Sequence, residues 1–229
     1  MSQMAERIAE VRDAIAESAR QSGRRPEEIE LMGVSKNHDR GAVEEAIRGG
    51  LTLFGENRVQ EGEQKFRDLP GAWELHLIGH LQRNKAKRVP GVFSGVHSID
   101  ATRTVEALES AAAAAGCRLD VLVEVNISGE QQKYGVPDRD ALEELLDSLE
   151  GAPSLRCRGL MGIAPWVGEE ARIRRSFSYL RELYEETKRS RSLPFDILSM
   201  GMSGDFRLAV AEGSTMVRIG TAIFGSRGY

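Results

Sequence analysis

Cysteine is scarce in this chain of 229 residues, which contains only Cys117 and Cys157. The two do not form a CxxC pair, and no dense cysteine framework surrounds them. Small disulfide-stabilised domains and cysteine-based zinc sites both need more cysteines than this. The sequence therefore predicts a reduced, cytoplasmic protein.

Long apolar segments and a basic leader are also missing. No stretch approaches about 18 consecutive apolar residues, the length that a membrane helix needs. The first residues include the acids Glu6, Glu10 and Asp13 instead of a basic start followed by an apolar run. We therefore expect no export signal, no membrane anchor and no membrane partner.

Positive charge is not in excess. The chain has 31 Lys and Arg residues against 35 Asp and Glu residues, which gives a formal net charge of −4. No basic stripe alternates with aromatic side chains, as a groove for single-stranded nucleic acid would require. We therefore expect no nucleic acid partner.

Apolar segments of strand length alternate with longer segments of helical pattern along the chain. An opening helix is indicated by Ile8, Val11 and Ile15, which recur at helical spacing. Eight strands are predicted after it, at residues 31–36, 52–55, 74–78, 96–99, 120–126, 158–163, 197–200 and 216–219. Seven helices are predicted between them, at residues 40–48, 59–67, 82–87, 102–115, 138–149, 169–190 and 204–212.

This alternation is typical of α/β proteins with a parallel sheet. It fits a single (β/α)8 TIM barrel with an extra N-terminal helix, and it also fits a doubly wound open sheet. We favour the barrel because candidate functional residues follow nearly every strand, whereas an open sheet would gather them near one switch point. A chain of this length is expected to form one domain over residues 1–229.

Two turns of small residues near the C-terminus indicate a phosphate site. Ser203 and Gly204 follow one predicted strand, and Gly220 and Thr221 follow the next. Backbone N–H groups in such turns can bind an oxyanion, and barrels commonly bind phosphate after their seventh and eighth strands. The glycines could also be simple helix caps or turns, but the paired arrangement favours binding. We call these four residues the phosphate cup.

Lys36 closes the first predicted strand, just before a polar turn, where a barrel would present it at its mouth. A lysine whose pKa is lowered can form an imine with an aldehyde. By position alone, a lysine at a strand end is more often a surface residue. Together with the phosphate cup, however, Lys36 suggests pyridoxal phosphate.

Arg218 lies inside the apolar run 216–219, so its guanidinium is expected to point into the interior. A carboxylate such as Glu124 could pair with it, because an unpaired buried charge is costly. Alternatively, Arg218 could face the pyridine nitrogen of pyridoxal phosphate, to which it could only donate a hydrogen bond. The ring would then be a weaker electron sink.

Two amides and two histidines remain as candidates. Asn57 and Asn126 follow predicted strands and could either bind a cofactor at the mouth or cap the next helix. His76 and His80 are four residues apart, but their neighbours predict a strand and a turn instead of a metal-binding helix. We therefore expect no metal site.

Seven sequence segments, spread over nearly the whole chain, resemble the family of pyridoxal phosphate homeostasis proteins. They are GVSK (33–36), FGENRVQE (54–61), HLIGHLQRNK (76–85), HSID (97–100), VNISGE (125–130), GLMGI (159–163) and the run 198–225. The resemblance implies a barrel similar to the N-terminal domain of alanine racemase, with pyridoxal 5'-phosphate held on Lys36 as an imine. The cofactor-binding residues that it implies are Lys36, Asn57, Met202, Ser203, Arg218, Gly220 and Thr221.

The implied function is intracellular cofactor homeostasis, in which the protein stores pyridoxal phosphate or delivers it to apo enzymes, without robust turnover. A racemase-like enzyme is an alternative, but it would need a second acid or base opposite Lys36. In racemases of similar fold that group is a tyrosine contributed through a second domain, which this chain is too short to include. An aldolase acting on a phosphorylated sugar could use the same lysine and cup. We expect a monomer, because the barrel is complete within one chain.

Overall fold

Eight parallel strands form a closed barrel in the computed structural model, which describes residues 2–130, 132–165 and 169–225. The strands are β1 (Glu30–Val34), β2 (Leu53–Glu56), β3 (Glu74–Leu77), β4 (Gly95–Ile99), β5 (Leu119–Val125), β6 (Leu155–Gly162), β7 (Ile197–Met202) and β8 (Met216–Ile219). Each pairs with the next in chain order, and β8 closes the ring against β1 with Arg218 opposite Met32. The predicted barrel is confirmed, and the open sheet is excluded.

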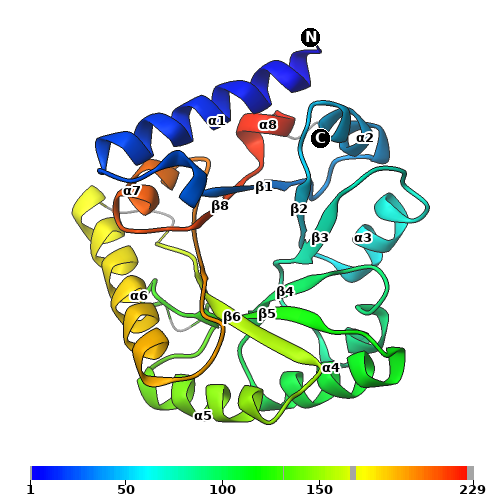
Figure 1. Ribbon diagram of the computed structural model, residues 1–229, viewed down its shortest axis with the longest axis vertical. Coiled ribbons are helices and arrows are strands. Elements are labelled where there is room, and N and C mark those ends of the chain that lie inside the picture. The colour runs from blue at the N-terminus through cyan, green and yellow to red at the C-terminus, as the bar shows by residue number, and fades with distance from the viewer. Residues whose placement is uncertain (1, 131, 166–168, 226–229) are drawn as a thin grey trace.

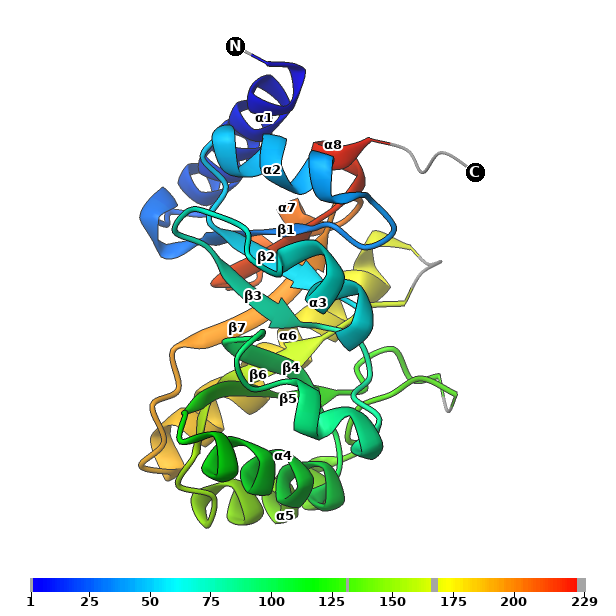
Figure 2. The same cartoon turned by 90° about the vertical axis from the view of Figure 1, so that its right-hand side faces the viewer.

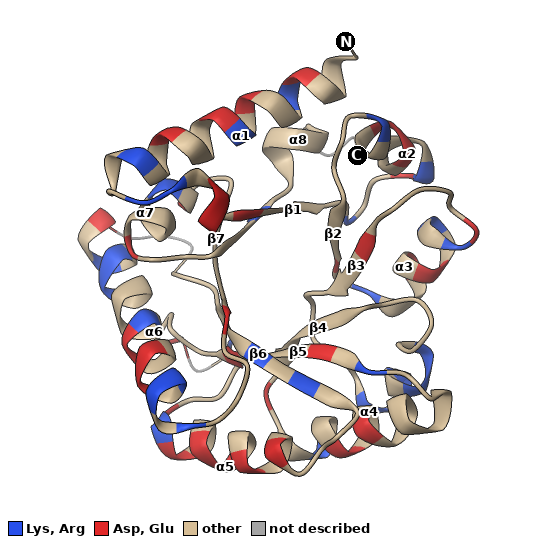
Figure 3. Cartoon of the chain, viewed as in Figure 1, with Lys and Arg blue, Asp and Glu red and all other residues tan. Residues whose placement is uncertain are grey.

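Helices surround the barrel (Figure 1). They are α1 (Gln3–Gln21), α2 (Arg40–Arg48), α3 (Val59–Phe66), α4 (Thr102–Ala115), α5 (Arg139–Glu150), α6 (Glu170–Ser190), α7 (Phe206–Ala211) and α8 (Thr221–Phe224), with 3-10 helices η1 (Pro26–Glu28) and η2 (Arg83–Arg88). Charged residues are frequent on these outer helices, whereas most strand positions are uncharged (Figure 3). The charged residues therefore lie mainly on the solvent-exposed outer helices, and the buried strands are mostly uncharged.

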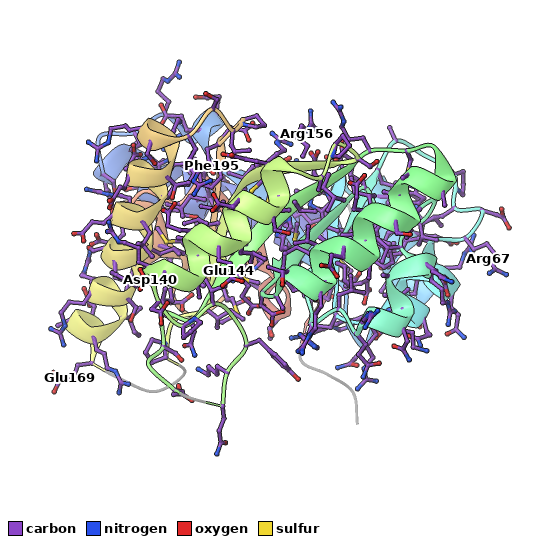
Figure 4. All side chains as sticks on the ribbon, turned by 90° about the horizontal axis from the view of Figure 1, so that it is seen from below. Arg67, Asp140, Glu144, Arg156, Glu169 and Phe195 are labelled. Carbon is purple, nitrogen blue, oxygen red and sulfur yellow. The ribbon has the colours of Figure 1, made fainter. Side chains whose placement is uncertain are left out.

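The sequence of α5 shows why such helices form where they do. Its leucines recur at helical spacing and are buried, namely Leu142, Leu145, Leu146 and Leu149. Asp138 caps the first turn by accepting a hydrogen bond from the Ala141 amide at 2.9 Å. Asp140 and Glu144 lie on the exposed side (Figure 4). The apolar face is therefore fixed against the sheet.

The predicted N-terminal helix, α1, packs across α2, α7 and α8 beside the first and last strands (Figure 1). Ile8 and Ala19 on its inner face are completely buried. A Cβ atom at Gly49, just after α2, would come within 2.9 Å of the Ile8 side chain. A glycine at that position lets the helix lie close to the barrel wall.

Apolar side chains fill the middle of the barrel. They form one buried cluster, made of Met32, Leu53, Leu122, Met161, Ile197 and Met216. A Cβ atom at Gly55 would stand 2.8 Å from the Met32 sulfur, so this strand position favours glycine. The interior is thus a packed core and not a pore, as is usual for this architecture.

The elements differ from the predicted ones mainly at their ends. β1 ends at Val34, so Lys36 follows the strand by two residues instead of closing it. The segment predicted as a helix at 82–87 is the 3-10 helix η2, and α8 has only four residues, too few to give a periodic pattern. Within the described residues, no helix is long and apolar enough to cross a membrane.

Candidate functional site

A cavity of about 370 Å³ lies at the carboxyl ends of the strands. In the side view of Figure 2, strands such as β3 run from left to right, so this mouth is on the right-hand side. All seven residues of the expected site line the cavity: Lys36, Asn57, Met202, Ser203, Arg218, Gly220 and Thr221. Folding therefore gathers residues from both ends of the chain around one space.

Lys36 lies on the cavity wall at a sharp change of chain direction. The next residue, Asn37, has a φ of 63°, a left-handed conformation that is uncommon for residues other than glycine. The His38 amide donates a hydrogen bond to the Ser35 carbonyl at 3.1 Å, which closes the turn. The half-buried Lys36 is thereby held at the mouth, between a buried strand and an exposed loop.

Arg218 is buried in the floor of the cavity, with 4% of its surface exposed. Its Nη1 donates hydrogen bonds to the Ser199 carbonyl at 2.8 Å and the Ser199 hydroxyl at 2.7 Å, and its Nη2 donates to the Gly162 carbonyl at 3.0 Å. These acceptors are neutral, and Glu124 acts on Arg218 through its charge, with no hydrogen bond or ion pair between them in the described chain. The expected alternative of a direct pair with Glu124 is therefore not what the structure has.

Two buried charges nevertheless influence each other across the barrel. Burial lowers the pKa of Arg218 to about 10, while Glu124 and Asp205 raise it, so the guanidinium keeps its proton at neutral pH. Burial raises the pKa of Glu124 to about 7, and the charge of Asp100 adds to this effect while Arg218 opposes it. The barrel interior near the mouth therefore contains a positively charged guanidinium and, outside the cavity lining, a carboxyl group whose pKa is about 7.

The four residues of the phosphate cup line the same cavity as Arg218. Asp205 fixes one of its two turns, because its carboxylate accepts a hydrogen bond from the Met202 amide at 2.6 Å. The backbone amides of Ser203 and Gly204 donate no hydrogen bond to any residue that the structure describes. They are therefore open to an acceptor from outside the chain, as an anion site requires.

Asn57 follows β2 and is positioned by its backbone. A Cβ atom at Gly79 would come within 2.3 Å of the Asn57 carbonyl oxygen, so the segment after β3 passes directly against it. Only a glycine allows this approach. Sequence reasoning did not single out Gly79, because a glycine between a strand and a turn has many possible causes.

Asn126 has a different role from either of the two expected for it. Its side-chain amide donates hydrogen bonds to the carbonyls of Glu130 and Lys133, and its side-chain oxygen accepts from Ser128. It is not part of the cavity lining, and the next helix is capped by Asp138. Asn126 therefore stabilises the loop after β5.

The histidines do not gather around a metal position. His76 lies in β3 and its Nδ1 is 2.8 Å from the Nε2 of His97, whereas His80 is 3.5 Å from Asp100. Burial lowers the pKa of His97 well below its usual value, and the charges of His76 and Arg218 add to this, so that ring is neutral. In the described part of the chain, no group of three or more potential ligands could hold a metal ion.

The cavity also has walls that the motifs did not predict. Ile78, Ile163 and Ile173 form an apolar part of the lining, and His38 and Asp205 add titratable groups. The three isoleucines come from β3, β6 and α6 or the residues next to them, and each fits an ordinary apolar pattern. Nothing in the sequence distinguishes them from core residues.

The barrel and its mouth define a class of protein. Residues 11–228 match the family model for the N-terminal domain of alanine racemase. Alanine racemase from Streptomyces coelicolor shares the fold with a TM-score of 0.69 at 22% identity, and the match covers 96% of this chain and 58% of that one. At that identity the likeness concerns the fold alone.

Relatives of full length narrow this class. The pyridoxal phosphate homeostasis protein of Pseudomonas aeruginosa is 42% identical over 232 residues, which cover 100% of this chain and 98% of the relative. The chain therefore belongs to the family of pyridoxal phosphate homeostasis proteins. PipY of Synechococcus elongatus, solved with pyridoxal phosphate bound, has a TM-score of 0.83 at 36% identity, with 97% of this chain and 100% of that chain covered.

Proposed function

We propose that this protein binds pyridoxal 5'-phosphate covalently through Lys36 and serves its homeostasis, storing or delivering the cofactor without robust turnover. The observation that carries the proposal is the convergence of Lys36, Arg218 and the phosphate cup on one cavity. The family membership and the cofactor-bound PipY structure support the same ligand.

The donor set fits this ligand. When bound, pyridoxal phosphate supplies an aldehyde that condenses reversibly with an amine, together with a phosphate dianion and an aromatic ring. Lys36 supplies the amine. Ser203, Gly220 and Thr221 offer hydroxyl and backbone donors for the phosphate, and Asn57 and Met202 lie close by on the lining.

Arg218 would hold the pyridine nitrogen as a donor only. Its guanidinium has five N–H groups. Hydrogen bonds to Ser199 and Gly162 occupy only some of them. The pKa of Arg218, about 10, keeps its guanidinium protonated at neutral pH. It therefore neither accepts a proton from a partner nor releases one. The pyridine nitrogen then stays unprotonated, which disfavours reactions that need strong carbanion stabilisation.

The remaining lining supports a carrier more than a racemase-like enzyme. Apart from Lys36 and Arg218, its titratable groups are His38 and Asp205, and no tyrosine belongs to it among the described residues. Asp205 already accepts the Met202 amide. Among the described residues, the lining therefore lacks the tyrosine that serves as the second acid or base in racemases of similar fold.

The proposal extends to the setting of the protein. We place it in the cytoplasm as a monomer, formed by one domain over residues 1–229, with apo forms of pyridoxal phosphate enzymes as partners and without nucleic acid or membrane partners. Both cysteines are free, which suits a reducing compartment.

Borohydride reduction followed by peptide mass spectrometry tests the proposal. The protein is purified, supplied with pyridoxal phosphate and reduced, and the pyridoxyl adduct is mapped. An adduct on Lys36 is expected. If none forms even with added cofactor, the assignment is wrong and a phosphorylated sugar becomes the better ligand.

Turnover separates the carrier from the enzyme. The loaded protein is incubated with L-alanine and the D-isomer is measured against an equal concentration of free pyridoxal phosphate. We expect no excess over the free cofactor. Racemisation well above that background would favour the racemase-like alternative.

A further inference from the structure

A second lysine, Lys65, is buried behind Lys36. It lies on α3 with 7% of its surface exposed and is not part of the cavity lining. Its Nζ donates to the Ser35 carbonyl at 2.6 Å and to the carboxylates of Glu56 at 2.9 Å and Glu61 at 2.7 Å. An ammonium group has three donors, so all of them are used. Lys65 is therefore fully engaged by acceptors within the chain and lies outside the cavity.

The two carboxylates that bind Lys65 also bind the chain on either side of Lys36. Glu56 accepts a hydrogen bond from the Ser35 hydroxyl at 2.6 Å. Glu61 accepts one from the backbone amide of Asn37, also at 2.6 Å. The Ser35 carbonyl belongs to the peptide unit before Lys36, and the Asn37 amide belongs to the one after it. One cluster, made of Glu56, Glu61 and Lys65, thus holds both peptide units that flank Lys36.

This arrangement is costly in free energy. Taking Lys65 and Glu56 out of water carries a desolvation penalty that an apolar filling of the same space would avoid, and burial raises the pKa of Glu56. One oxygen of Glu56 is buried without a hydrogen-bond partner in the described chain. Asn37 is in addition held in a left-handed conformation, which is uncommon for residues other than glycine. Such costs are typical of sites where backbone position matters for function.

We propose that Lys65, Glu56 and Glu61 are positioning residues, which fix the backbone around Lys36 so that its amine meets the cofactor aldehyde in one orientation. The inference rests on the proposed function of Lys36. It assigns no contact with the cofactor to the cluster. A fixed backbone limits the orientations that the Lys36 amine can adopt. Fewer unproductive orientations make bond formation faster and more favourable between two groups held in one cavity.

A matched pair of variants tests the cluster at Glu61. Glu61→Gln keeps an oxygen that can accept from Asn37 and Lys65, whereas Glu61→Met has a similar shape and no acceptor. Lys65→Met is the companion change on the other side of the interaction. Amide hydrogen exchange of the cofactor-free protein is measured over residues 33–39. We expect exchange at Asn37 to rise about tenfold or more in Glu61→Met, the equivalent of one lost charge-assisted hydrogen bond, and to change much less in Glu61→Gln.

The consequence for the cofactor is measured in two backgrounds. With Lys36 present, we expect Lys65→Met and Glu61→Met to lower the rate of covalent attachment of pyridoxal phosphate about tenfold, and Glu61→Gln to restore most of it. In the Lys36→Ala background, the same changes should leave noncovalent affinity for the cofactor within about twofold. Equal losses in both backgrounds would mean that the cluster only supports the fold. An unchanged attachment rate would overturn the proposal.

The role of Lys36 and the role of the cluster can be contradicted separately. If the unmodified protein forms no adduct at Lys36, the proposed function is wrong, and the exchange rates still decide whether the cluster fixes this backbone. If the adduct forms but exchange at Asn37 is the same in Glu61→Met and Glu61→Gln, the cluster does not position Lys36. Should Lys65→Met fail to fold, the Glu61 pair carries the test.

Discussion

Asp120 and Glu124 lie near opposite ends of the same strand, β5, and their surroundings give them opposite acidities. Asp120 is near the amino end of the barrel, where it accepts hydrogen bonds from Arg156 at 2.6 Å and Arg158 at 2.9 Å. Burial alone would raise its pKa, but these two arginines outweigh burial and lower it. Near the mouth, burial raises the pKa of Glu124 to about 7.

The arginines differ in the same way. Arg158 bridges Asp120 and Asp196, so its charge is neutralised within the chain. Arg218 donates only to neutral oxygens of Ser199 and Gly162. In Figure 4, Arg156 lies at one edge of the molecule and Glu169, which precedes α6, at the opposite edge, so the two ends of the barrel are well separated. The amino end pairs its charges internally, whereas Arg218 at the mouth donates to no carboxylate among the described residues.

The largest effect is expected at the mouth from Lys36→Ala. This change should abolish the borohydride-reducible link to pyridoxal phosphate completely, while the phosphate cup still binds the cofactor without a covalent bond. Absorbance and intact mass after reduction measure the link, and equilibrium dialysis measures the binding. Lys87→Ala, on the exposed 3-10 helix η2, is the control and should behave like the parent. A link of undiminished yield in Lys36→Ala would disprove the assignment.

Removing the charge of Glu124 should erase the difference between the two ends of β5. Because burial raises its pKa from 4.5 to about 7, the folded state holds this proton more tightly than the unfolded state does. Its contribution to the free energy of unfolding, about 3 kcal/mol at most, is therefore present at low pH. It is lost as the pH rises from about 4.5 to 7 and stays lost above pH 7. Urea unfolding at pH 5 and pH 8 should show Glu124→Gln gaining stability relative to the parent at the higher pH.

For Asp120→Asn we expect the opposite pH dependence of stability. Since the folded pKa of Asp120 is lowered, its contribution is present above the unfolded pKa of about 3.9 and is lost as the pH falls through the folded value. The parent should therefore lose its advantage over this variant only in acid. If both variants followed the same pH profile, the contrast between the two carboxylates would be incorrect.

The fold and the part of the cavity lining that follows the strands could be predicted because both depend on local sequence patterns. Alternating strand and helix segments specify a barrel, and a barrel brings the residues after its strands to one mouth. Lys36, Arg218 and the phosphate cup were found in this way, and all of them line the cavity. Whether they bind pyridoxal phosphate stays a prediction.

The charge network around them could not be predicted, because it depends on neighbours distant in the sequence. Lys65 follows a helical pattern in which a lysine is expected to face water, yet it is buried against the carbonyl of Ser35, thirty residues earlier. Glu124 was considered as a partner of Arg218, but the register of the barrel gives that arginine Ser199 and Gly162 instead. Local sequence carries no signal for such pairings.

A change at the amino end should reduce stability and leave the cofactor untouched. Arg158→Met removes ion pairs to the partly buried Asp120 and to Asp196, whose side chain is 54% exposed, so we expect a loss of about 1–2 kcal/mol in the free energy of unfolding. Arg156→Met is the matched control, and because its side chain is 48% exposed it should cost less than about 0.5 kcal/mol. Denaturant unfolding measures both, and equal costs would contradict the buried role of Arg158.

The smallest effect is expected from removing a hydroxyl in the phosphate cup. In contrast to Arg158→Met, this change should weaken cofactor binding and leave stability unchanged. The Ser203 hydroxyl makes no hydrogen bond with the described residues, so Ser203→Ala should leave the unfolding free energy within about 0.5 kcal/mol. If the hydroxyl binds the phosphate dianion, its loss should weaken noncovalent cofactor binding in the Lys36→Ala background about tenfold, which corresponds to one hydrogen bond to a charged group. Ser203→Thr keeps the hydroxyl and should retain most of the affinity. A loss of stability together with unchanged affinity would place Ser203 among the structural residues, and the mouth would then resemble the amino end more than we propose.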